Sequence, residues 1–134
     1  MTDAGPAAGL LLDTHVALWV TDSADRLDAG TRRLLDRPGG PVYISAISVA
    51  EIAIKVSIGL LRIPGSPADV IESTGCESLD LRAPHANDVA RLPLLHRDPF
   101  DRLLICQALA ENLVLVTADR QVLAYPGVRL HRVN

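Results

Sequence analysis

Two uninterrupted apolar runs are the clearest hydrophobic pattern in the chain. Residues 10–12 are three leucines and residues 113–116 alternate leucine with valine, and polar residues follow each run closely. Short runs of this kind are typical of parallel strands that are buried on both faces. We also predict strands over residues 42–44, over the alternating stretch 77–81, and over 128–130.

Helical periodicity separates these strands. The apolar spacing and the cap signals predict helices over residues 15–20, from Asp28 or Thr31 to 35, over about 47–58, 68–73 and 84–92, from 99 to 111 or 112, and over a short stretch after 119. Strands that alternate with helices indicate an α/β fold, in which helices flank both faces of a parallel central sheet. The 134 residues suit a single domain, which we place at 9–134 after a flexible tail at 1–8.

The stretch from His96 to Ala108 combines a helix start with two acids. Asp98 occupies the place of an N-cap, and Pro99 takes the first helical position. The residues that share the apolar face of this helix are Leu104, Ile105, Ala108 and Leu109. Asp101 leans toward that face, where a carboxylate needs a partner or a cation. The alternative is a capping box, with Asp98 as the cap and Asp101 three residues later.

A second acid falls on an apolar helix face. Glu51 lies four residues after Ile47 and three before Ile54, and Ile58 continues the same face. Glu51 either points inward to a site or pairs with Lys55, four residues on, at a solvated surface. The apolar residues flank Glu51 on both sides, which favours the inward orientation.

Two further acids follow the apolar runs. Asp13 comes directly after residues 10–12, and Asp119 comes three residues after 113–116. In open parallel sheets, ligand sites form beyond the carboxyl ends of the strands. We therefore predict that these two carboxylates converge with those of Glu51 and Asp101 on one crevice. Taken alone, Asp13 and Asp119 each also suit the N-cap of the helix that follows.

Four clustered carboxylates point to a metal site. Carboxylates held close together repel one another unless a cation neutralises them, and oxygen ligands favour Mg²⁺ or Mn²⁺ over zinc. The histidines are scattered without zinc spacing, and we assign three of them to packing or to the surface: His15, His85 and His131. A hard cation in a carboxylate pocket suits the hydrolysis of phosphodiester bonds.

Basic residues beside the acids are candidates for holding phosphates. Arg97, Arg102 and Arg120 flank the acids in the sequence, although solvated surface charge is the simpler interpretation of each one alone. His96 would contact RNA or orient the loop. The net charge of −3 argues mildly against a plain nucleic-acid-binding protein, but it is compatible with an enzyme whose acids gather at one site.

The remaining composition favours a cytoplasmic protein. The sequence has neither a long apolar run nor a basic segment followed by an apolar core at its start, so we expect neither a membrane span nor a secretion signal. The two cysteines, Cys76 and Cys106, are expected to be buried, reduced thiols, and reduced thiols fit a cytoplasmic location.

The acids also carry a family resemblance. The matching segments, in chain order, are 10–15 (Leu-Leu-Leu-Asp-Thr-His), 45–55 (Ser-Ala-Ile-Ser-Val-Ala-Glu-Ile-Ala-Ile-Lys), 96–105 (His-Arg-Asp-Pro-Phe-Asp-Arg-Leu-Leu-Ile) and 115–119 (Leu-Val-Thr-Ala-Asp). Together, and in this order, they resemble a PIN-domain protein, specifically a VapC-type toxin of a bacterial toxin–antitoxin pair.

The resemblance implies a single PIN-like domain and a Mg²⁺- or Mn²⁺-dependent endoribonuclease that hydrolyses RNA. The residues that match the family's catalytic and metal-binding quartet are Asp13, Glu51, Asp101 and Asp119. Asp98 matches an auxiliary acid, and Thr117 matches a hydroxyl beside the last acid. Ala50 replaces an aromatic residue that is common in relatives, a change that affects packing rather than chemistry. The family further implies a homodimer in the bacterial cytoplasm and a VapB-type antitoxin whose C-terminal segment lies across the acidic groove.

Two alternatives come from other classes of function. One is a non-catalytic module that uses a PIN fold to bind RNA or protein; loss of one of the four acids would favour it, and none is lost. The other is a phosphatase-like α/β hydrolase that forms a phospho-aspartate on Asp13. Such enzymes usually carry a second Asp two residues on, where this chain has His15.

Overall fold

Five parallel strands form the sheet of the computed structural model, which describes residues 6–134. The strands are β1 (Gly9–Leu12), β2 (Val42–Ser45), β3 (Glu77–Leu79), β4 (Leu113–Thr117) and β5 (Arg129–Arg132). They lie in the order β3-β2-β1-β4-β5, and every neighbouring pair is parallel. The predicted α/β class with a parallel central sheet is confirmed.

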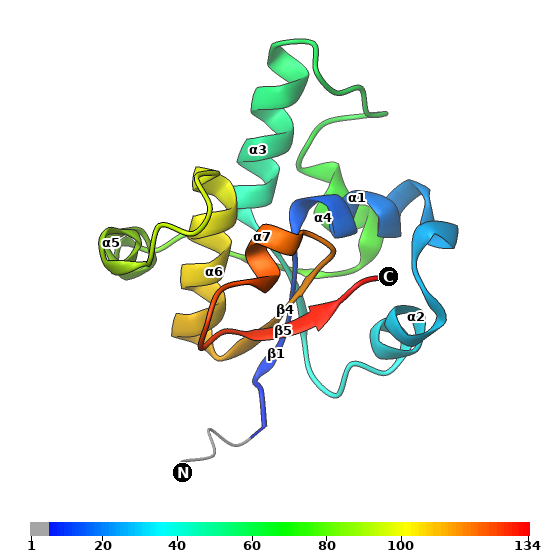
Figure 1. The fold of residues 1–134 in the computed structure, drawn as a ribbon. Helices are drawn as coiled ribbons and strands as arrows, with labels where there is room; N and C mark the ends of the chain where they lie inside the picture. The colour runs from blue at the N-terminus through cyan, green and yellow to red at the C-terminus, as the bar shows by residue number, and fades with distance from the viewer. Residues whose placement is uncertain (1–5) are drawn as a thin grey trace.

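Helices connect the strands and cover the sheet (Figure 1). They are α1 (Thr14–Asp22), α2 (Ala29–Asp36), α3 (Ala46–Ser57), α4 (Asp69–Thr74), α5 (Ala83–Asp88), α6 (Pro99–Glu111) and α7 (Arg120–Leu123). Short 3-10 helices lie at Ala24–Arg26 and Val89–Arg91. Within residues 6–134, no helix has both the length and the apolar character needed to cross a membrane.

The two apolar runs form the centre of the sheet. Leu11 pairs in register with Leu115, and both side chains are at most 1% exposed. Because successive side chains of a strand point to opposite faces, Leu10 and Leu12 pack in one core with residues of α1, α2 and α4. Leu11 packs in a second core with residues of α6 and α7. Two cores on two faces explain why the central strands are continuously apolar.

Side-chain caps direct several helices away from the carboxyl edge of the sheet. The Ser45 hydroxyl accepts a hydrogen bond from the backbone of Ile47 and so starts α3 directly after β2. The same hydroxyl donates to the Gln107 side chain of α6 at 2.6 Å. Asp98 caps α6, Pro99 follows at its first position, and Asn112 ends it in the left-handed conformation. The predicted start and end of this helix are confirmed.

The structure differs from the predicted apolar faces at three positions. Ile54 and Ile58 were expected on an inward face, but they are 47% and 63% exposed because the end of α3 projects past the sheet (Figure 1). Leu109 was expected among the buried residues of α6 and is 44% exposed. The predicted helix over 84–92 is also broken: α5 ends at Asp88 and a 3-10 helix follows before Pro93.

The predicted tail at 1–8 falls partly outside the described residues, which begin at Pro6. The last part of that tail is attached to the body of the protein. The backbone N–H of Ala8 donates to the carbonyl oxygen of Asn112 at 2.8 Å, and the Asn112 side chain donates to the carbonyl oxygen of Pro6 at 3.2 Å. Pro6 and Ala8 are therefore held against the end of α6.

Candidate active site

Two of the predicted site acids follow adjacent strands at the carboxyl edge of the sheet. Asp13 comes after β1, and its backbone N–H donates to the carbonyl oxygen of Val116 in β4 at 3.0 Å. The Thr117 hydroxyl donates to Oδ2 of Asp13 and accepts the backbone N–H of Asp119 at 3.0 Å. Thr117 thus links the two acids at the carboxyl ends of two neighbouring parallel strands.

Asp101 enters the same region from the first turn of α6. Its Oδ2 lies 2.7 Å from Nε2 of His96, and the same nitrogen lies 3.8 Å from Oδ2 of Asp119. Asp98 accepts hydrogen bonds from the backbone of Phe100 and Asp101, which makes it the cap of the helix. The capping-box alternative is half right, because Asp98 caps α6 while the Asp101 carboxylate bonds to His96.

Glu51 points inward from α3 and is 3% exposed. Its Oε2 accepts a hydrogen bond from Nζ of Lys55 at 2.8 Å, so the inward orientation and the Lys55 pair occur together. Its Oε1 is the one buried side-chain nitrogen or oxygen in the described part of the chain that has no hydrogen-bond partner. An unpaired buried carboxylate oxygen is costly, so this atom is a ready ligand for a cation.

The electrostatics show that the acids act on one another. Burial raises the pKa of Asp101 to about 7; the bond to His96 opposes that rise, while the charges of Asp98, Asp13 and Asp119 add to it. Burial also raises the pKa of Asp13, against the hydrogen bond from Thr117. Crowded, partly desolvated carboxylates of this kind bind protons or cations to relieve their repulsion.

Lys55, on α3, is a cation that lies close to the site acids. Its pKa is raised by the hydrogen bond to Glu51 and by the charges of Glu51, Asp98 and Asp101. The charges acting on Lys55 and on Asp101 together involve all four acids of the predicted quartet and the auxiliary Asp98. The structure therefore brings these five carboxylates to one edge of the sheet.

The donor set of this edge fits a hard cation. Carboxylate oxygens dominate it, and the unpartnered Oε1 of Glu51 is available. Candidate ligand atoms of His96, Asp98 and Asp101 also lie within 4.8 Å of one another. Within this group of three, Oδ1 of Asp98 accepts the hydrogen bonds that cap α6, and Nε2 of His96 is bonded to Asp101.

The three arginines proposed as phosphate contacts lie in different environments. Arg97 and Arg120 are exposed at the edges of the acidic group. Arg102 is 9% exposed, and its guanidinium donates to the carbonyl oxygens of Val89, Leu92, Pro93 and His96 and to the Tyr125 hydroxyl. These bonds give Arg102 a structural role in holding residues 89–96 rather than a place among the phosphate contacts.

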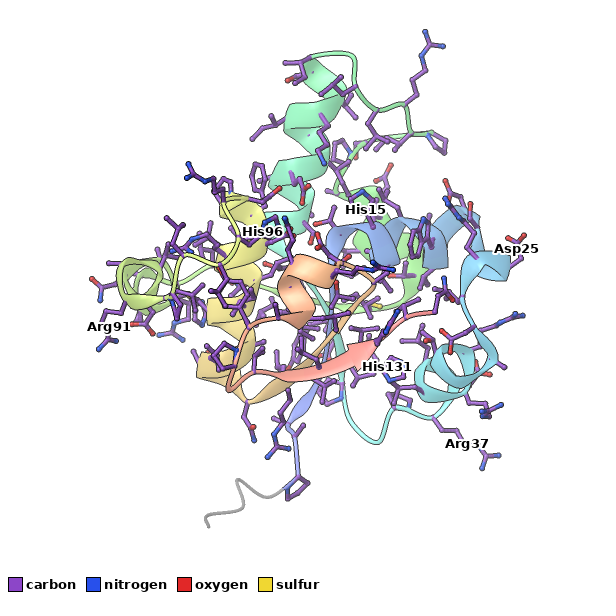
Figure 2. All side chains as sticks on the ribbon, in the orientation of Figure 1. His15, Asp25, Arg37, Arg91, His96 and His131 are labelled. Carbon is purple, nitrogen blue, oxygen red and sulfur yellow. The ribbon has the colours of Figure 1, made fainter. Side chains whose placement is uncertain are left out.

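Of the remaining histidines, only His15 lies beside the acids of the candidate site. His85 is buried, where its ring accepts the backbone N–H of Arg82 and contacts Glu111 at 2.9 Å. His131 lies on β5 and is hydrogen-bonded to Thr31 at 2.9 Å. His15 and His96 both lie at the carboxyl edge, beside α1 and the start of α6 (Figure 2). Packing is confirmed for His85, and His15 lies at the surface as expected.

Several residues that support the site were not predicted from the sequence. Thr14 donates from α1 to the Ser48 hydroxyl of α3 at 2.9 Å, and both side chains are buried. Ser45 and Gln107 join α3 to α6. A small hydroxyl at the end of a strand is a usable signal for a cap, as at Ser45, but the partners on distant helices have no local signal.

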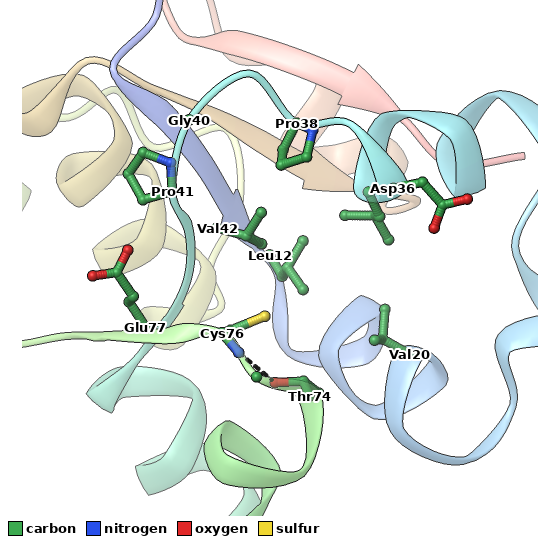
Figure 3. A pocket seen from close by; sticks show the side chains of 12 residues that line it. Leu12, Val20, Asp36, Pro38, Gly40, Pro41, Val42, Thr74, Cys76 and Glu77 are labelled. Carbon is green, nitrogen blue, oxygen red and sulfur yellow. Dashed lines mark hydrogen bonds between the residues drawn. The ribbon is translucent and has the colours of Figure 1, made fainter.

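A cavity lies away from the site acids, between α2, α4 and the starts of β2 and β3 (Figure 3). Its volume is about 470 Å³, and Leu12, Val42 and Cys76 are among its lining. The backbone N–H of Cys76 donates to the Thr74 hydroxyl, and burial raises the pKa of the thiol. Cys76 is half-buried, whereas Cys106 is buried as predicted. A protonated thiol beside apolar side chains supplies no hydrolytic chemistry, so size alone does not mark the active site.

A parallel sheet with a group of carboxylates at the carboxyl ends of its strands is typical of α/β proteins that bind a ligand at this edge. A protein-family model for the PIN domain matches residues 10–128, so the chain belongs to the PIN domain family. The family predicted from the sequence is confirmed. A search of curated proteins finds no match.

Solved structures share the fold. The chain is similar to a structure of VapBC2 from Rickettsia felis bound to promoter DNA, with 20% identity, a TM-score of 0.68, and coverage of 93% of this chain and 98% of that one. It is also similar to DNA-bound VapBC from Salmonella typhimurium (17% identity, TM-score 0.63, coverage 92% and 96%). A third similar structure is FitAcB from Neisseria gonorrhoeae (19%, 0.59, 92% and 96%). At these identities the likeness supports the fold.

Proposed function

We propose that the chain is a Mg²⁺- or Mn²⁺-dependent endoribonuclease that acts as the toxin of a VapBC-type toxin–antitoxin pair. The observation that carries the proposal is the Oε1 of Glu51, a buried carboxylate oxygen without a partner inside a group of five acids. Nothing in such a pocket offsets the repulsion as well as a divalent cation does. Membership of the PIN family supports nuclease activity.

Each residue has a role that its contacts support. The acids that would hold the cation are Asp13, Glu51, Asp101 and Asp119. Asp98 fixes the start of α6, and Thr117 orients Asp13. When bound, the divalent ion supplies Lewis acidity at the phosphodiester and lowers the pKa of bound water. His96 orients Asp101, and the exposed Arg97 and Arg120 would contact backbone phosphates of the RNA.

The partners follow from the same assignment. The similar structures include two VapBC complexes bound to DNA. By analogy, we propose a VapB-type antitoxin for this chain, a homodimeric toxin, and a bacterial cytoplasmic setting in which both RNA and DNA are present.

The test is cleavage of a mixed RNA pool by the purified, antitoxin-free protein in Mg²⁺, in Mn²⁺ and in EDTA. We expect fragments with either metal and none in EDTA. The Asp101→Asn variant should be folded and inactive. A matched control is Asp36→Asn, which makes the same chemical change at an exposed acid in the lining of the cavity of Figure 3, and it should cleave normally.

Two outcomes would contradict the proposal. Full activity of folded Asp101→Asn would remove the acidic group from the mechanism. Absence of cleavage, together with absence of Mn²⁺ binding in a calorimetric titration, would favour a non-catalytic binding module. Mn²⁺ binding without cleavage of the pool would instead direct the search to a narrower RNA target.

A further inference from the structure

A small hollow opens beside the acids, and part of its lining is not used by the proposed cation site. It has a volume of about 230 Å³ and is lined by Asp13, His15, Trp19, Ala118 and Asp119. Two of these residues are site acids, and two carry aromatic rings from the first turns of α1. The hollow is therefore continuous with the proposed site and bounded by ring surfaces. Its volume is below that of pockets for drug-sized ligands and suits one planar ring system.

The indole ring of Trp19 contacts two neighbouring side chains, those of Arg26 and His15. It is the single tryptophan of the chain, and its side chain is only partly buried against the core of α1, α2 and α4. The guanidinium of Arg26 lies 4.9 Å from the ring centroid, and the ring of His15 lies 6.4 Å away at 49°. Arg26 is not among the residues that line the hollow, so its contact with the indole leaves that space open.

We propose that this hollow receives one unpaired nucleobase of the RNA, stacked against Trp19, next to the phosphodiester that is cut. This inference rests on the proposed function and adds the part of the substrate that the acids do not recognise. Among the described residues, the lining of the hollow contains neither lysine nor arginine that would hold a phosphate, so the uncharged base is the portion of a nucleotide that enters. Aromatic side chains bind bases of single strands in this way, with little dependence on sequence.

The chain carries its own reporter for this test, because its tryptophan emission comes from Trp19 alone. The full-length protein in Mg²⁺ is mixed by stopped flow with a random single-stranded RNA 12-mer, so that binding is observed before cleavage. The matched ligand is a ribose–phosphate chain of the same length without bases. We expect the RNA to quench the emission and the abasic chain to leave it unchanged.

Two variants separate stacking from folding. Trp19→Phe keeps an aromatic ring, whereas Trp19→Leu keeps only apolar bulk. We expect Trp19→Leu to raise the KM for RNA about tenfold, with kcat and Mn²⁺ binding unchanged, and Trp19→Phe to restore most of the loss. Wild-type emission decides the question if Trp19→Leu does not fold.

The outcomes keep this inference apart from the proposed function. Equal quenching by the two ligands, or none, overturns the base-binding role, while metal-dependent cleavage by the wild type would still stand. Quenching by RNA without any cleavage would support the hollow and count against the nuclease. An arginine-rich peptide is the third ligand in this test. Quenching by the peptide and not by RNA would assign the hollow to a protein partner and overturn the inference.

Discussion

Removing the charge of Asp101 should stabilise the metal-free protein while it abolishes activity. The pKa of Asp101 is raised from 3.8 to about 7, chiefly by burial and against the hydrogen bond from His96. An acid whose folded pKa lies above its unfolded pKa contributes stability that is complete at low pH. That contribution is lost as the pH rises toward the folded pKa, because the unfolded chain releases the proton first.

The size of this effect follows from the shift. Without screening by water, a rise of the Asp101 pKa from 3.8 to about 7 corresponds to about 4 kcal/mol. The Asp101 side chain is 15% exposed, and water screens part of the repulsion. We therefore expect the free energy of unfolding of the metal-free wild type to fall by about 1 to 2 kcal/mol between pH 5 and pH 8 on account of this group.

Urea unfolding in EDTA at pH 5 and pH 8 measures this loss. Asp101→Asn should lack the Asp101 part of the pH dependence and be about 1 to 2 kcal/mol more stable than the wild type at pH 8, because Asn keeps the shape of the side chain without its charge. Asp36→Asn is the matched control and should follow the wild type. Mn²⁺ at a hundredfold excess over its dissociation constant should add about 2.7 kcal/mol to the wild type and little to Asp101→Asn. Identical pH slopes for wild type and Asp101→Asn would refute the reasoning.

Three further substitutions test how the site is supported. Lys55→Met removes the hydrogen bond to Oε2 of Glu51 and would leave both carboxylate oxygens buried and unpaired. We expect it to lower the free energy of unfolding of the metal-free protein by about 1 to 3 kcal/mol. In a thermal melt, Mn²⁺ should recover most of this loss. Arg102→Met strands several backbone carbonyls and should lower the free energy of unfolding in urea by about 3 kcal/mol, without rescue by Arg102→Lys. Ser45→Ala loses the cap of α3 and the bond to Gln107, and we expect a loss of about 1 to 2 kcal/mol in the same assay.

The elements that surround the site were predictable because their signals are local. The runs 10–12 and 113–116 are buried strands, and Asp98 with Pro99 starts α6 as expected. Each signal depends on a few adjacent residues and on a period of two or 3.6. The convergence of Asp13 and Asp119 followed from one topological rule, the shared carboxyl edge of parallel strands.

The details that set the chemistry were not predictable, because they depend on distant contacts. The bond between His96 and Asp101 requires the loop over residues 92–98 to turn back on α6. That loop is held by Arg102 and by the Tyr125 hydroxyl, which accepts from the backbone of His96 at 3.0 Å. Tyr125 lies 29 residues away, and no periodic pattern relates the two. The exposed Ile54 failed as a prediction for a similar reason, since the sequence does not indicate where α3 leaves the sheet.

The helix-cap and site interpretations of the acids are alternatives in the sequence, but in the structure they describe different oxygens of the same side chains. Asp13, Asp98 and Asp119 each use Oδ1 to accept backbone N–H groups at a helix start. Oδ2 of Asp13 accepts from Thr117, and Oδ2 of Asp119 faces His96. A helix cap needs one oxygen and tolerates Asn as well as Asp, whereas a cation site needs the charge. Asn variants at these positions therefore separate catalysis from folding, and alanine variants, which remove both oxygens, do not.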